Sequence, residues 1–112
     1  MTFSTPTPNT IQVKLSKGSR TPIGSIMTMG VSGDWTIGRS HNVSQFTTLE
    51  VWDEETETVY ITPIVQLVRV YVDKNNQDRY VICFNRHDVT QVNMDFSQKG
   101  FRFPGHGVRL SN

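Results

Sequence analysis

Short stretches in which apolar and polar residues alternate recur along this chain, and a two-residue period is typical of strands with one buried face. Residues 11–15 show this alternation directly, and residues 46–52 and 58–62 are rich in the residue types that favour strands. We expect residues 46–52 and 58–62 to pair through the acidic connection at 53–57, which we interpret as a solvated turn. The pattern therefore predicts antiparallel strands.

The longest apolar run, residues 64–72, is the clearest strand signal in the sequence. A polar, turn-prone segment at 73–79 follows this run, and residues 80–84 return as the second strand of a hairpin. We expect residues 64–72 to form a central strand of the sheet. Pro63 has no amide hydrogen, so we expect it to interrupt the sheet or to lie at its edge.

Shorter strands are predicted on either side of this hairpin. Residues 23–29 are interpreted as a second strand, and the glycines within 30–34 indicate a tight turn after it. Near the end of the chain, residues 101–103 and 108–110 alternate as two short strands around the turn at 104–107.

The segment 88–96 permits two interpretations. Asp88 and Gln91 have the spacing of a capping box, which favours a short helix. The β-branched residues Val89, Thr90 and Val92 favour a strand instead. The sequence leaves both structures open for this segment.

The composition supports a mainly β fold. The chain has no alanine and only four leucines, so it lacks the usual residues of a helical bundle. Residues 1–10, with two prolines among threonines, are expected to be an extended or disordered arm. Residues 11–112 are expected to form a single β-rich domain: a small antiparallel sheet, curled barrel or sandwich, with at most one short helix near residues 88–96.

The charge pattern and the single cysteine limit the functional classes. The formal charge is +3 for residues 1–45, −4 for 46–79 and +2 for 80–112, so basic residues of the two ends would form one patch if the ends meet. Near-neutrality overall argues against wide, non-specific duplex binding. Cys83 cannot form an intramolecular disulfide, and no stretch approaches the roughly 18 apolar residues of a membrane span. We therefore expect a cytoplasmic protein without membrane contact.

No catalytic motif is recognisable, so we assign no catalytic residue and expect no cofactor. His41, Cys83, His87 and His106 are the main nitrogen and sulfur candidates for a metal, but they lack the paired short spacings of a zinc site, and no metal site is predicted. If the chain were an enzyme, His87 or His106, with Lys99 stabilising charge, would suit a small metal-independent phosphodiesterase.

The strongest candidate for ligand binding is the basic and aromatic strip at residues 101–109. It combines the rings of Phe101 and Phe103, the guanidinium groups of Arg102 and Arg109, and the imidazole of His106. Aromatic rings stack on nucleobases and arginine forks match phosphate oxygens. The alternative is that both phenylalanines are core residues and both arginines face solvent.

A second candidate is the turn at residues 17–20, where Lys17 and Arg20 flank a glycine and a serine. Such a turn presents positive charge and backbone N–H groups to a phosphate. The alternative is an ordinary solvated hairpin turn.

These observations lead to a non-enzymatic binding module as the first functional hypothesis. Its ligand would be a phosphate-bearing, nucleotide-like small molecule or a nucleic-acid segment. The alternative is a protein–protein adaptor or inhibitor, such as a viral or mobile-element accessory protein, that acts through an exposed strand edge or the acidic hairpin. A homo-oligomer is expected if the long hairpin pairs between copies.

Overall fold

The computed structural model describes residues 9–18, 22–39, 41–96, 103–105 and 107–111. Its strands are β1 (Thr10–Leu15), β2 (Val31–Thr36), β3 (Thr48–Asp53), β4 (Thr58–Val72), β5 (Asp78–Phe84), β6 (Thr90–Asn93) and β7 (Val108–Ser111). Between them lie the α-helix α1 (Ile23–Met29) and the 3-10 turns η1 (Val43–Gln45) and η2 (Arg86–Asp88).

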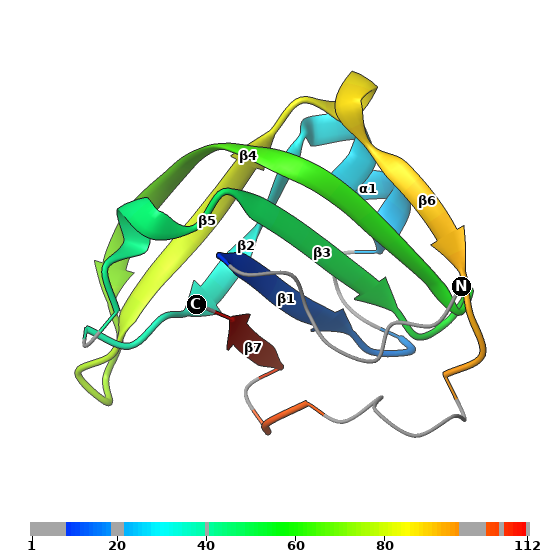
Figure 1. Ribbon diagram of the computed structural model, residues 1–112. Coiled ribbons are helices and arrows are strands. Elements are labelled where there is room, and N and C mark those ends of the chain that lie inside the picture. Colours follow the sequence, from blue (N-terminus) through cyan, green and yellow to red (C-terminus); the bar gives the residue numbers. More distant parts are fainter. Residues whose placement is uncertain (1–8, 19–21, 40, 97–102, 106, 112) are drawn as a thin grey trace.

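The strands form a strongly curled sheet in the order β2-β5-β4-β3-β1-β7, and β6 adds to β4 (Figure 1). The predicted class, mainly β with a curled sheet, is confirmed. Most neighbouring strands are antiparallel, but β1 and β3 are parallel, with Thr10 opposite Thr48 and Leu15 opposite Asp53. A parallel pair requires a long crossover connection, and here that connection contains α1, β2 and η1.

The inner face of the curled sheet packs against α1 and holds the main hydrophobic core. Ile11 and Val13 of β1 lie opposite Leu49 and Val51 of β3, and all four are fully buried. Ile26 of α1 belongs to the same cluster. The alternation of residues 11–15 correctly predicted a strand whose apolar residues share this inner face. Its polar face is not solvated as expected, however, because Gln12 is buried as well.

The outer face of β1, β3 and β4 is also covered. Trp52 and Val59 lie opposite each other on β3 and β4, and Phe96 packs on them. These residues form a second, smaller cluster, which we call the outer cluster. Met94 and Phe103 border that cluster, so residues on both sides of the segment 97–102 contribute to the cover. This part of the sheet consequently has apolar layers on both faces.

The prediction of a strand at residues 23–29 is wrong, because these residues form α1. Ile23, Ile26 and Met27 recur at the three- and four-residue spacing of a helix and pack on the core. Gly30 ends the helix at φ 69°, and its N–H donates to the carbonyl of Ile26. Most of the predicted turn at 30–34 is strand β2 instead.

The hairpin predicted from residues 64–72 and 80–84 is confirmed, since Ile64 pairs with Phe84 and Val72 with Asp78. β4 does not stop at Pro63, however. Pairing with β5 ends at Ile64 and pairing with β6 begins at Ile61, so Pro63 lies where β4 changes partners on that edge. A proline is tolerated there because no ladder hydrogen bond depends on its missing amide.

The remaining open segment, 88–96, contains no α-helix in the structure. η2 forms a single 3-10 turn, in which the side chain of Asn85 accepts a hydrogen bond from the His87 N–H. Thr90–Asn93 then pairs with β4 as β6. The β-branched residues of this segment, and not the capping-box spacing, determined its structure.

Candidate ligand-binding site

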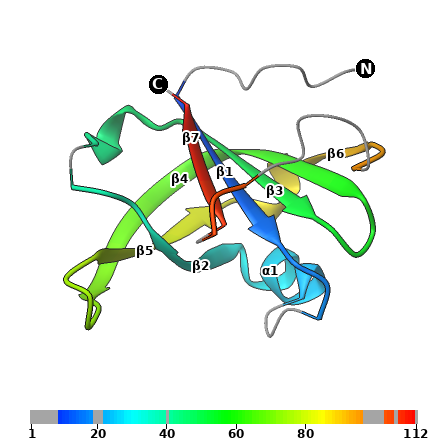
Figure 2. The ribbon, with the colours of Figure 1, turned by 90° about the horizontal axis from the view of Figure 1, so that it is seen from below.

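The two end strands of the sheet, β2 and β7, approach each other without pairing among the described residues (Figure 2). A Cβ added to Gly107, just before β7, would lie 3.5 Å from the Trp35 ring of β2. We call this line of approach the seam. The seam is where the curled sheet comes close to closing into a barrel.

A hollow of about 350 Å³ lies at one end of the seam, and we call it the first hollow. Its lining residues include Lys14, Leu15, Ser16, Trp35 and Phe103. The turn residues Pro104, Gly105 and Gly107 complete the wall. Its volume falls within the usual range for small-ligand sites.

Backbone hydrogen bonds define the wall formed by the C-terminal turn. The Gly107 N–H donates to the Pro104 carbonyl at 2.8 Å, and the Lys14 N–H donates to the Gly107 carbonyl at 2.8 Å. Gly107 adopts φ 78°, which strongly favours glycine. The end of β1 and the turn before β7 are therefore fixed to each other beside the hollow.

Arg109 belongs to a buried polar row that crosses the outer face of three strands. It lies opposite Gln12 of β1, which in turn lies opposite Glu50 of β3. The Arg109 Nε donates to Gln12, the Gln12 Nε2 donates to Glu50 at 2.8 Å, and the Trp52 Nε1 donates to the same Glu50 oxygen at 3.0 Å. Burial lowers the pKa of Arg109, and the negative charge of Glu50 opposes that shift.

The guanidinium of Arg109 also lies against two aromatic rings. Its Cζ is 5.2 Å from the ring centroid of Trp52 and 4.4 Å from that of Phe103, within the range of cation–π contacts. The Phe103 ring meets Trp52 edge-on at 5.6 Å between centroids. Phe103 thus contacts the outer cluster and also lines the hollow, and the half-buried Arg109 lies against its ring.

The turn at Lys17 has a carboxylate beside it. The Lys17 N–H donates to the Glu54 side chain at 3.2 Å, and the Glu54 N–H donates to the Leu15 carbonyl. One backbone donor that the sequence offered to a phosphate is therefore already in use. The remaining predicted binding residues, Phe101, Arg102, His106 and Arg20, lie outside the described residues.

Sequence reasoning did not single out Lys14 and Trp35, although both line the first hollow. Lys14 is a polar position of an alternating strand, where an exposed lysine is unremarkable. Trp35 belongs to a stretch without a clear pattern. Only the approach of β2 to the C-terminal turn brings these side chains together with Phe103.

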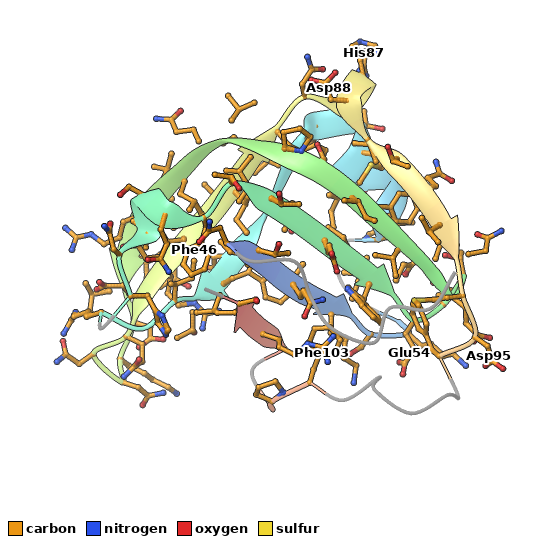
Figure 3. All side chains as sticks on the ribbon, viewed as in Figure 1. Phe46, Glu54, His87, Asp88, Asp95 and Phe103 are labelled. Carbon is orange, nitrogen blue, oxygen red and sulfur yellow. The ribbon has the colours of Figure 1, made fainter. Side chains whose placement is uncertain are left out.

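Of the residues considered for catalysis, His87 is the one that the structure describes, and it lies away from this hollow. His87 is exposed in η2, and Figure 3 places it at the opposite end of the molecule from Phe103. Lys99 and His106 lie outside the described residues. Across the described part of the chain, no three His, Cys, Asp or Glu side chains are grouped so that they would hold a metal ion.

Comparison with known proteins identifies no relative: no protein-family model matches the sequence, and no match is found among curated proteins or solved structures. None of the helices in the described residues is long and apolar enough to cross a membrane.

Proposed function

We propose that this protein is a non-enzymatic binding module of the cytoplasm that captures a phosphate-bearing, nucleotide-like ligand in the first hollow. One observation carries the proposal. The strip at 101–109 and the end of β1 that leads into the turn at 17–20 are far apart in the sequence, yet residues from both line the same hollow.

Different side chains of this hollow would bind different parts of the ligand. Trp35 and Phe103 offer aromatic faces for a base, and stacking of this kind contributes about 1–3 kcal/mol per base. Lys14 supplies the positive charge and Ser16 a hydroxyl for phosphate oxygens. Arg109 is given a supporting role, because its guanidinium lies on the ring of Phe103 and its Nε is bonded to Gln12.

Calorimetric titration with adenosine monophosphate and with adenosine tests the assignment. Lys14→Ala should weaken binding of the nucleotide by about tenfold and leave adenosine unaffected, since only the nucleotide carries the charge that Lys14 contacts. Lys74→Ala is the matched control, because Lys74 is an exposed lysine in the loop between β4 and β5. It should bind both ligands as the original protein does.

If Lys14→Ala and Lys74→Ala lose nucleotide affinity equally, the loss reflects the net charge of the protein and not a contact with Lys14. That result would contradict the proposed site. So would nucleotide binding that is unchanged in both Lys14→Ala and Phe103→Leu. If no nucleotide binds, the proposed function is wrong.

A second candidate function is strand addition to a protein partner. The second half of β4, Ile64–Val72, favours this function, and we call it the outer half. The Ile64 N–H donates to the Thr47 carbonyl just before β3. From Val65 to Val72 the strand pairs only with β5 among the described residues, which leaves its other edge free. Val65, Val70, Tyr71 and Val72 are exposed along this stretch. Arg69 is its only charged residue, so little charge discourages pairing.

A second copy of the chain is the partner to examine first for this edge. Light scattering after size exclusion should detect a dimer that Val70→Lys dissociates, because a lysine on a pairing edge opposes association. A monomer at every concentration would exclude self-pairing.

A further inference from the structure

A second hollow, of about 560 Å³, lies farther along the seam. Thr36 and His41 line it from β2 and the residues after it, and Leu110 lines it from β7. Asn75 and Gln77 border it from the loop between β4 and β5. Of these residues, the sequence drew attention only to His41, as a candidate metal ligand.

The two hollows follow one another along the same two strands. Trp35 lines the first hollow and its neighbour Thr36 lines the second. On the other side of the seam, Gly107 lines the first and Leu110 the second. Three residues of extended chain correspond to about 10 Å. A ligand that occupies the first hollow can therefore continue along the seam into the second.

The charges at the second hollow compensate one another. Arg79 donates to Asp34 at 3.0 Å and to the Thr36 hydroxyl at 2.7 Å, and it lies 3.6 Å from a carboxylate oxygen of Asp73. Asp73 also accepts hydrogen bonds from the backbone N–H groups of Asn75 and Gln77. The fixed charges are therefore used within the protein, and no strong phosphate site remains among them.

The groups that remain suit a nucleobase better than a phosphate. Asn75 and Gln77 have exposed carboxamides, each with a donor and an acceptor that match the edge of a base. His41 adds a ring and Leu110 an apolar surface. This polar but nearly neutral lining contrasts with Lys14 and the aromatic rings of the first hollow.

We infer that the ligand continues from the first hollow into the second, and that it is a single-stranded oligonucleotide of at least two nucleotides. This inference rests on the proposed function. The first hollow takes one base and its phosphate, and the second takes the neighbouring base through the amides of the β4–β5 loop.

Calorimetric titration with deoxyadenylate monomer, dimer and trimer tests the inference. Affinity should rise about tenfold or more from monomer to dimer. Asn75→Ala combined with Gln77→Ala should remove that rise and leave binding of the monomer unchanged. These truncations retain the fold because the backbone N–H groups, and not the side chains, bond to Asp73.

Gln66→Ala combined with Gln91→Ala provides the matched control, since both are exposed amides on β4 and β6, away from the seam. The control should keep the full gain in affinity from monomer to dimer. Equal affinity for monomer and trimer would overturn the inference and leave the single-nucleotide site in place. Absence of binding by every probe would overturn the proposed function together with it.

Discussion

β4 is one continuous strand, yet its two halves have opposite environments. In Thr58–Pro63, β3 pairs on one edge and β6 on the other for most of the length, and Val59 is fully buried. In Ile64–Val72, only β5 pairs with the strand among the described residues, and Val65 is 70% exposed. The half with the longer apolar run is thus the more exposed one.

The difference follows from what lies against each half. The first half of β4, Thr58–Pro63, which we call the inner half, packs on both faces. Tyr60 contacts the main core on one face, and Val59 belongs to the outer cluster on the other. Leu67 of the outer half borders the main core, but no described residue forms an outer cluster over Val65 or Val70. Burial of a strand therefore depends on the partners that the fold brings to it, and not only on its own hydrophobicity.

The largest effect is expected from removing the buried carboxylate of Glu50 on the outer face of the sheet. Glu50 is 2% exposed and accepts hydrogen bonds from Gln12 and Trp52. Glu50→Ala should lower the free energy of unfolding by about 3–5 kcal/mol, because two buried donors lose their acceptor and Arg109 loses its opposing charge. Urea denaturation measures the loss.

Glu50→Gln is the control for that substitution, because a glutamine retains an acceptor oxygen in the same place. Its loss of stability should be clearly smaller. If Glu50→Ala costs less than about 1 kcal/mol, the buried row is not holding the outer face together.

An intermediate effect is expected from the same substitution in each half of β4. Val59→Ala should cost about 2 kcal/mol, because it removes buried methyl groups and leaves a cavity. Val65→Ala should change the free energy of unfolding by no more than about 0.5 kcal/mol. Equal losses in urea denaturation would mean that the outer half is covered in solution, as strand addition requires.

The smallest effect concerns a polar contact at the far end of the outer half. The pKa of Asp34 lies below its ordinary value of 3.8, chiefly because the Tyr71 hydroxyl donates a hydrogen bond to it and further because Arg79 bonds to it. A lowered folded-state pKa contributes stability above about pH 4, and this contribution is lost as the pH falls through the folded-state pKa. Tyr71→Phe should raise the pKa of Asp34 and weaken that dependence.

Carboxyl NMR titration of Asp34 checks the last prediction directly. Tyr60→Phe is a control that changes a different tyrosine of β4, and it should leave the Asp34 titration where it is. An Asp34 pKa that does not move in Tyr71→Phe would leave Arg79 as the main cause of the shift.

Much of the fold could be predicted from the chain alone, because strand alternation and turn residues are local signals. The hairpin between β4 and β5 and the strands at Thr10–Leu15 and Val108–Ser111 were predicted on that basis. α1 was missed because a short segment with isoleucine and methionine satisfies helical and strand patterns alike, and its packing on the core decided between them.

The candidate site was predictable only in part. The sequence drew attention to Phe103 and Arg109 through their residue types, but it offered two simple roles for the strip, and neither describes Arg109. That side chain is stacked on Phe103 and Trp52 and bonded to Gln12. A contact between residues so far apart in the sequence leaves no local pattern that would reveal it.

A mainly β chain with one long hairpin follows from the sequence alone, since the period of apolar residues reports which side chains share a face. Tertiary structure decided which face is covered, where β1 meets β3 in parallel, and that β2 approaches the C-terminal turn at the seam. Those outcomes depend on pairing between distant segments, whose energy comes from burial across the whole sheet. For that reason both hollows became visible only in the folded molecule.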